Sequence, residues 1–286
     1  MATQERSAPG ADPAIVIDGL TVVRSKHEVL HHLSTSVARG RVTGLLGPSG
    51  SGKTTLIRCI VGAQQIAAGR VTVLGLPAGS PPLRRKLGYV TQAPAVYEDL
   101  TVSENLHYFA SVMGASRSTV VSLIAEFELK SIEHQLVRNT SGGQRARTSL
   151  VCALVGDPEL LLLDEPTVGQ DPVLREQMWD AFRARAAAGT TVLVSSHVMD
   201  EASRCDDLLL LRSGALLAQG TPAAIQAEAG VDDMDAAFLH LIRRAEAADG
   251  AHAAGDGAHA LADGAHAPAD AAASPHAPKH EGAHQR

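Results

Sequence analysis

Eight consecutive residues in the first quarter of the chain have the types and spacing that bind phosphate. They are Gly47, Pro48, Ser49, Gly50, Ser51, Gly52, Lys53 and Thr54. This run fits the pattern G-x-x-x-x-G-K-[ST], whose glycines let backbone N–H groups point at phosphate oxygens. We expect Lys53 to reach the β- and γ-phosphates, Thr54 to offer its hydroxyl to Mg²⁺, and Thr55 to join the phosphate-binding set. The run therefore predicts a site for ATP or GTP with Mg²⁺.

The segments on either side of this loop fit the strand–loop–helix context that the motif requires. Residues 42–46 are mostly apolar and predict a buried strand. Residues 55–61 place apolar side chains at helical spacing. A helix that begins at the loop would add positive potential for phosphate. The alternative is a chance glycine-rich turn, which would not explain the flanking pattern.

Two adjacent carboxylates could complete a nucleotide site. Asp164 and Glu165 follow four leucines, residues 160–163, which predict a buried strand. Ligands of a parallel sheet gather at the carboxyl ends of its strands, so we expect Asp164 to lie beside the phosphate loop and bind Mg²⁺. Glu165 is suited to polarising a water against the γ-phosphate. The alternative is that the pair only caps the helix predicted from residue 174.

A polar stretch in the middle of the chain separates the classes of nucleotide-using protein. Residues 141–144 read Ser-Gly-Gly-Gln at the start of a predicted helix, and a GTPase or a nucleotide kinase does not need such a stretch. A GTPase also needs an Asn-Lys-x-Asp element to read guanine, yet neither Asn105 nor Asn139 is followed by lysine. The sequence therefore favours an ATPase, and a phosphoryl-transfer kinase is the weaker alternative.

Composition predicts a globular cytosolic protein. The chain has 286 residues, 45% hydrophobic and 20% charged, and a formal net charge of −6. One or two domains can form a core at this length, and the negative charge argues against a dedicated nucleic-acid surface. Cys59, Cys152 and Cys205 are few and widely spaced, which indicates core residues in a reducing compartment. We expect no secretory signal and no spanning helix, so a membrane role would need a partner.

Apolar strands alternate with helical segments, which predicts an α/β fold with a mainly parallel sheet around a P-loop NTPase core. The N-terminal part predicts an antiparallel β subdomain, with strands at 14–18 and 20–23 joined by a hairpin turn at Asp18-Gly19. The other strands are expected at 29–37, 70–75, 87–92, 190–194, 208–211 and 215–218, and helices at 174–188, 198–203, 222–227 and 234–247.

Changes of character along the chain predict its domain boundaries. We expect a flexible N-terminus over residues 1–13 and one nucleotide-binding domain over residues 14–248. Residues from about 93 to 156 are predominantly helical and predict a lobe inserted into that domain, with helices near 102–113, 118–128 and 143–155.

The last part of the chain, residues 249–286, is rich in Ala, Gly, His and Asp and repeats Asp-Gly-Ala-His-Ala three times. It has almost no large apolar side chains to bury, which predicts disorder. The alternative is a histidine-rich metal buffer or a pH-sensitive arm. No metal site is assigned to it.

The motifs, in this order, resemble those of the ATP-binding cassette (ABC) family over roughly residues 14–246. By this resemblance, residues 47–54 are the phosphate loop, Asp164 is the Walker B aspartate and Glu165 is the catalytic glutamate. The remaining motifs are matched by Gln92 in the Q-loop, Ser141, Gly142, Gly143 and Gln144 in the signature, Asp171 in the D-loop of residues 168–172, and the switch histidine His197.

The resemblance implies a head-to-tail dimer with a second copy of the chain or a paralogous cassette. Each ATP would lie between one subunit's phosphate loop and the other's signature, whose helix N-terminus suits contact with the γ-phosphate. Gln92 would contact Mg²⁺ or water and report to a partner, and Asp171 would lie across the dimer interface. His197 would bind the γ-phosphate and orient Glu165.

Three positions depart from the family pattern. The signature is preceded by Thr140 and the D-loop contains Gln170, where the family usually has leucine. Arg24 occupies the place of the aromatic residue that stacks on adenine, and a guanidinium plane can also stack on a base. The phosphate-contacting residues are intact, so we still expect ATP binding.

Within the family, the chain resembles the ATP-binding subunits of ABC-2 type and drug-resistance exporters. The resemblance rests on residues 100–106, 199–206 and 220–222. It implies a separate multispanning permease, a coupling surface near Gln92 to Asn105, and a peripheral location on the cytoplasmic side of the cell membrane, without a nucleic-acid partner. The alternative is a soluble ABC-type ATPase that is not coupled to transport.

Overall fold

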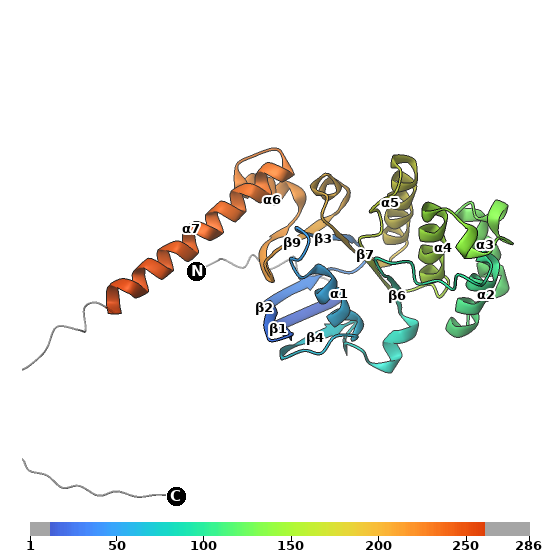
Figure 1. Cartoon of the computed structure of the whole chain (residues 1–286), viewed down its shortest axis with the longest axis horizontal. Helices are drawn as coiled ribbons and strands as arrows, with labels where there is room; N and C mark the ends of the chain where they lie inside the picture. The colour runs from blue at the N-terminus through green and yellow to red at the C-terminus, as the bar shows by residue number, and fades with distance from the viewer. Residues whose placement is uncertain (1–11, 261–286) are drawn as a thin grey trace, which may run out of the picture. The chain divides into compact units, whose positions relative to one another are not determined.

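The computed structural model describes residues 12–260 of the chain, with side chains up to residue 247 (Figure 1). One compact unit extends to Ile242, and a second begins at Arg243. Residues 1–11 and 261–286, for which we predict a flexible N-terminus and a disordered tail, lie outside the described part.

The N-terminal part of the chain forms an antiparallel sheet, as the sequence predicts. Its strands are β1 (Ile15–Arg24), β2 (His27–Val37), β4 (Ala68–Val73) and β5 (Leu76–Pro77), in the order β2-β1-β4-β5. Each neighbouring pair runs antiparallel. Its buried side chains share one apolar cluster with the first helix, α1 (Lys53–Val61).

The hairpin turn between β1 and β2 lies at Ser25 and Lys26, so the prediction of a turn at Asp18-Gly19 was wrong. Ser25 and Lys26 have φ values of 49° and 68°, the left-handed conformation that a type I′ turn requires at both positions. Asp18 and Gly19 lie inside β1, where the register with β2 shifts after Ile17. An Asp-Gly pair supplies positive φ to a bulge as readily as to a turn, which explains the error.

A second, mainly parallel sheet forms the core and confirms the predicted fold class. Its order is β10-β9-β3-β8-β7-β6. Within this sheet, as far as the structure describes it, the β9–β10 pair is antiparallel and the other pairs are parallel. The strands are β3 (Val42–Leu46), β6 (Leu87–Val90), β7 (Leu160–Asp164), β8 (Thr191–Ser196), β9 (Asp207–Arg212) and β10 (Ala215–Gly220). In β7, Leu160 and Leu162 pack into one apolar cluster while Leu161 and Leu163 pack into another, because a parallel strand is covered on both faces.

Three helices gather at one end of the compact unit and form the expected helical lobe (Figure 1). They are α2 (Val102–Met113), α3 (Arg117–Glu126) and α4 (Gly142–Leu154), with short 3₁₀ segments η1 (Pro81–Arg85) before the lobe and η2 (Lys130–Ile132) and η3 (Val137–Asn139) within it. Thr101, Ser116 and Ser141 cap α2, α3 and α4 by accepting a backbone N–H hydrogen bond in the first turn. Leu106, Val120 and Leu150 are fully buried in the lobe's core.

The remaining helical segments are α5 (Pro172–Ala187), η4 (Met199–Arg204), α6 (Pro222–Ala229) and α7 (Met234–Ala260). The helix α7 continues past the expected end at residue 247, so the backbone of residues 249–260 is helical where we predict disorder. The many alanines of this segment favour helix and account for the difference. Among the described residues, no helix combines the length and the apolar character needed to span a bilayer.

The three cysteines are buried and free, as expected for core residues. Burial raises the pKa of Cys59 to about 11 and that of Cys152 and Cys205 to about 12. The thiols are therefore protonated near neutral pH and poorly nucleophilic.

Candidate functional site

The phosphate loop connects β3 to α1 and is shaped by its glycines. Gly50 and Gly52 have φ values of 82° and 104°, conformations that glycine adopts without strain. The Lys53 ammonium donates hydrogen bonds to the carbonyl oxygens of Gly47 at 2.7 Å and Pro48 at 3.1 Å. The loop therefore curls around its lysine.

Lys53 carries its charge in a nearly water-free environment. The side chain is 4% exposed, and its ammonium lies 3.5 Å from one carboxylate oxygen of Glu165. Burial lowers the pKa of Lys53, and the carboxylates of Glu165 and Asp164 partly offset this effect. A cation in such surroundings gains stabilisation from an incoming phosphate, because a buried charge is costly unless it is paired.

Asp164 ends β7 and is 1% exposed. Its Oδ1 accepts hydrogen bonds from the hydroxyl groups of Thr54 at 3.1 Å and Ser195 at 2.8 Å. The strand β8 lies between β3 and β7 and pairs Ser195 directly with Asp164. The structure thus brings together Thr54 and Asp164, which are 110 residues apart in the chain.

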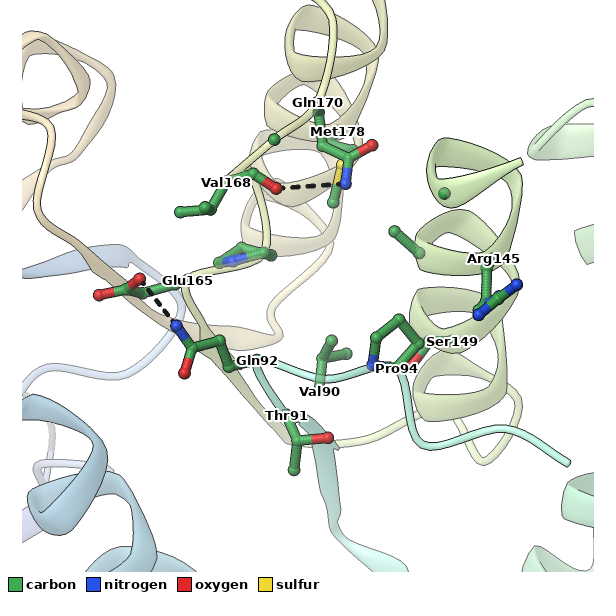
Figure 2. Close-up of a pocket in the computed structure, with 14 residues that line it drawn as sticks. Val90, Thr91, Gln92, Pro94, Arg145, Ser149, Glu165, Val168, Gln170 and Met178 are labelled. Atoms are coloured by element: carbon green, nitrogen blue, oxygen red, sulfur yellow. Dashed lines mark hydrogen bonds between the residues drawn. The ribbon is translucent and has the colours of Figure 1, made fainter. Parts of the chain in front are cut away.

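Glu165 follows β7 directly and is oriented by several neighbours. It has a φ of 52°, a left-handed conformation that costs a non-glycine residue about 1 to 3 kcal/mol. Its N–H donates to Ser195 Oγ at 2.9 Å. Its Oε2 accepts a hydrogen bond from Gln92 Nε2 at 3.3 Å and lies 3.4 Å from His197 Nδ1, and Figure 2 shows the Gln92 and Glu165 side chains pointing toward one another. The three residues predicted as catalytic therefore meet at one carboxylate.

Ser195 is the member of this group that has no role assigned from sequence. Its hydroxyl donates to Asp164 and accepts from the Glu165 N–H, so a single group orients both acidic residues. It is fully buried in β8. A hydroxyl directly after the apolar run Val192–Val194 was the available signal, because a buried polar side chain needs hydrogen-bond partners.

A cavity of about 320 Å³ lies beside Glu165 (Figure 2). Its walls come from four segments: Gln92 and its neighbours at the end of β6, residues between Glu165 and Gln170 after β7, the first turns of α4 from Gly142, and Met178 of α5. The cavity therefore connects the region around Glu165 with the helix that begins at the signature.

The signature residues form the N-terminal turn of α4. Ser141 Oγ accepts from the Gln144 N–H at 3.2 Å, and the Gln144 side chain accepts from the Ser141 N–H at 2.9 Å, which is a capping box. Ser141 and Gly142 are exposed, and a Cβ added to Gly142 would meet no atom within 4 Å. Among the described residues, no hydrogen bond or ion pair is found between residues 141–144 and the phosphate loop of the same chain. This helix N-terminus is open to an approaching group.

The D-loop leads into α5, and Asp171 caps that helix. Asp171 Oδ1 accepts from the N–H groups of Val173 and Leu174, both at 3.0 Å. The neighbouring Gln170 donates weakly to the Val168 carbonyl at 3.4 Å. The side-chain amide oxygen of Gln170, Oε1, is buried without a hydrogen-bond partner in the described structure.

The other two departures from the family pattern lie in different surroundings. Thr140 is 7% exposed, and its hydroxyl donates to the Val137 carbonyl at 2.7 Å. The buried hydroxyl therefore has a hydrogen-bond partner at the position where the family usually has leucine. Arg24 is exposed at the end of β1, opposite His27 in the hairpin. Its contact with adenine remains a prediction.

Comparison with known proteins agrees with these motifs. The family model described as ABC transporter matches residues 30–168. The chain is 39% identical over 223 residues to the Nod factor export ATP-binding protein I of Rhizobium meliloti (strain 1021), covering 75% of this chain and 67% of that protein. It is 42% identical over 199 residues to the probable multidrug ABC transporter ATP-binding protein YbhF of Escherichia coli (strain K12), covering 68% of this chain but only 34% of that protein.

Solved structures are similar to most of the chain. The ATP-binding subunit of an ABC transporter has a TM-score of 0.74 and 28% identity to this chain, covering 80% of this chain and 99% of that one. A dimeric ATP-binding cassette bound to ADP and Pi has a TM-score of 0.67 at 22% identity, covering 72% of this chain and 98% of that one, and supports the fold alone. The chain belongs to the ABC transporter family and carries the ATP-hydrolysing cassette of that family.

Proposed function

We propose that this protein is the ATP-hydrolysing subunit of an ABC exporter that energises a separate permease. The observation that carries the proposal is the convergence of Lys53, Gln92 and His197 on the Glu165 carboxylate, at distances of 3.3 to 3.5 Å. A carboxylate placed in this way beside a phosphate loop suits hydrolysis of the γ-phosphate rather than its transfer to a second substrate.

The proposed chemistry divides among the residues of this site. Lys53 and the loop N–H groups bind the phosphates, and Glu165 orients and polarises the attacking water. Gln92 and His197 fix the direction of that carboxylate, and His197 also contacts the γ-phosphate. The alternative assignment of Glu165 as a simple helix cap has less support, because Asp171 caps α5.

Mg²⁺ fits the donor set at the end of β7. The Thr54 hydroxyl and the Asp164 carboxylate lie 3.1 Å apart, and Mg²⁺ prefers such oxygen ligands. Thr54 and Asp164 would bind the ion, with Gln92 as a further oxygen ligand. Bound Mg²⁺ would neutralise charge that develops on the phosphates.

We further propose that two cassettes close head to tail around ATP. The exposed Ser141 and the open space in front of Gly142 support approach of a phosphate bound to a second copy or to a paralogous cassette. Val168 and Val173 are 42% and 69% exposed on either side of Asp171, which suits burial of this segment in an interface.

A permease would dock beside the Q-loop, at the surface between Gln92 and Asn105. Asn105 is fully buried and fixes this segment, because its side chain accepts from the Tyr97 N–H at 2.8 Å and donates to the Tyr97 carbonyl at 2.9 Å. The Tyr97 and Tyr108 rings are about half exposed and meet edge to face, with centroids 5.1 Å apart. Exposed aromatic side chains on a rigid support suit a protein interface, and the export functions in the relatives' names support transport outward across the cell membrane, with this chain on the cytoplasmic side.

Purification from native membranes tests the assignment. We expect the full chain to co-purify with a multispanning permease and its ATPase rate to rise in that complex. Tyr97→Ala should weaken this association while leaving the basal ATPase rate of the isolated chain intact, with exposed Val121→Ala on α3 as the matched control. A chain that never associates with a permease, and whose ATPase rate is indifferent to membranes, would favour the soluble ATPase.

A further inference from the structure

The turn between β9 and β10 packs against the phosphate loop. Its two residues, Ser213 and Gly214, have φ values of 46° and 78°, which is the pattern of a type I′ turn. The Gly214 N–H donates to the Ser51 carbonyl oxygen at 3.0 Å, and the Gly214 carbonyl accepts from the His31 N–H at 2.9 Å. The turn is therefore bonded to the phosphate loop on one side and to β2 on the other.

The packing at this point leaves no room for a side chain. A Cβ added to Gly214 would lie 2.2 Å from the Val29 carbonyl oxygen, and one added to Gly52 would lie 3.3 Å from the same oxygen. A Cβ on Gly47 would lie 2.1 Å from the carbonyl oxygen of Leu211 in β9. Glycines at both ends of the phosphate loop thus allow β2 and the β9–β10 hairpin to approach the loop backbone closely.

We propose that the Ser213–Gly214 turn is a positioning element for the phosphate loop. A trans peptide directs its carbonyl and the following N–H to opposite sides. Bonding the Ser51 carbonyl to Gly214 therefore directs the Gly52 N–H away from the turn and fixes the tilt of that peptide. Ser51 is 2% exposed and Gly214 is buried, so water cannot readily replace this bond.

This inference rests on the proposed function of the phosphate loop, and it adds a segment that lies more than 150 residues further along the chain. The turn does not touch phosphate itself in this account. It acts through Ser51, so altering it should change nucleotide affinity more than the rate of the chemical step.

Alanine at Gly214, compared with alanine at Gly230, tests the proposal in the full chain. Gly230 ends α6 with a φ of 69°, close to that of Gly214, but a Cβ there would meet no atom within 4 Å. Both substitutions impose similar backbone strain, and only the one at Gly214 displaces the turn from the phosphate loop. We expect Gly214→Ala to raise the Kd of a fluorescent ATP analogue and the KM for ATP about tenfold, with kcat changed less than threefold, while Gly230→Ala leaves the Kd and KM within twofold of the original.

Amide hydrogen exchange on the unmodified chain gives a second test that does not depend on a variant folding. ATP should slow exchange at residues 211–216 together with exchange at residues 47–55, because the Gly214 N–H is bonded to the loop. Equal nucleotide affinity in the two glycine variants, or protection of the loop without protection of the turn, would overturn the positioning role. A chain that binds no nucleotide in any form would instead overturn the proposed function itself.

Discussion

The two regions that we propose act on ATP differ in how complete they are within one chain. At the carboxyl edge of the core sheet, Lys53 and Asp164 are buried, and the partly exposed Thr54 donates a hydrogen bond to Asp164. At the start of α4, Ser141 is exposed, and within the described part of the chain its hydrogen bonds are the capping box with Gln144 and the first bond of the helix, to the Arg145 N–H. The first region is already assembled, whereas the second has the geometry of a contact that awaits a partner.

The difference separates interactions that form during folding from interactions that form when a partner binds. Burial and hydrogen bonding fix the first region during folding, so its geometry is set before nucleotide arrives. The N-terminus of α4 is fixed as a helix end, but a site forms there only when a phosphate approaches. The free energy of that contact is therefore available for the dimer closure that we propose.

Glu165→Gln should have the largest effect. The amide keeps the side chain's shape but cannot accept a proton, so kcat should fall by about 10² to 10⁴-fold. Lys53, Thr54 and Asp164 are unchanged, so ATP should still bind and a dimer should accumulate in gel filtration with light scattering. Glu159→Gln, at the other end of β7 in an exposed pair with Lys86, is the matched control and should retain activity.

Persistent monomer in Glu165→Gln with bound ATP would contradict the composite site. It would also indicate that Gln170 or Thr140 weakens the interface relative to the leucines usual in the family.

Ser141→Ala should lower kcat about tenfold with little change in ATP affinity of the isolated subunit. A hydrogen bond to a charged group contributes about 1.5 to 3 kcal/mol, and 1.4 kcal/mol corresponds to a factor of ten. The substitution also removes a helix cap, so Ser116→Ala, which removes the equivalent cap of α3, controls for lost stability. ATPase kinetics and nucleotide titrations measure the two effects.

Mixing variants tests whether Ser141 acts across the interface. A heterodimer of Ser141→Ala with Lys53→Ala contains one site with both defects and one site with neither. Partial recovery of ATPase activity on mixing these two impaired variants is the expected result. If Ser141→Ala lost ATPase activity and ATP binding equally, and mixing restored no activity, Ser141 would act within its own subunit.

Much of the assembled region could be predicted from sequence because it depends on local pattern. The phosphate loop, Asp164 and Glu165 each follow an apolar strand, and parallel strands end at one edge, so their meeting follows from topology. Ser195 and Gly214 could not be assigned in this way. Ser195 acts through hydrogen bonds to Asp164 and Glu165, which lie 31 and 30 positions earlier in the chain. Gly214 acts through a hydrogen bond to Ser51 of the phosphate loop. Only the folded sheet brings these residues together.

The wrong prediction of the first hairpin turn also arose because contacts between distant segments decide the structure there. Asp18-Gly19 has the composition of a turn, while Ser25 and Lys26 adopt positive φ without glycine or asparagine. Pairing of β1 with both β2 and β4 decides where the chain can reverse, and local propensity was overridden by that tertiary constraint.

Gln170→Leu should have a smaller effect, seen in stability rather than catalysis. The side-chain amide oxygen of Gln170, Oε1, is buried without a hydrogen-bond partner in the described structure, and leaving such an acceptor unsatisfied costs about 1 to 3 kcal/mol. Leucine removes that cost, so the free energy of unfolding should rise by about 1 kcal/mol in urea denaturation. Gln170→Glu, which would place a charge at the same position, should lower it; a stability ranking in the reverse order would contradict this account.

Deleting residues 249–286 should have the smallest effect. We propose that residues 14–248 are sufficient for the cassette's activity, and the ATPase rate of the truncated chain should remain within about twofold of the original. Zinc titration of both forms checks the alternative role of the histidine-rich tail. A several-fold loss of ATPase activity on truncation would mean that the tail contributes to catalysis.

The strand order β3-β8-β7 determines where this chain can accept an inserted residue. Neighbouring strands lie about 4.8 Å apart, so Ser195 and Asp164 meet because β8 and β7 end in step. Thr54, in the first turn of α1, reaches Asp164 because the phosphate loop follows the adjacent strand β3. Inserting one residue within any of these strands would turn its terminal side chain to the opposite face of the sheet. Insertions in the segments that enter these strands from their other ends leave that alignment intact, so length variation is tolerated there and excluded from the three strands and the phosphate loop.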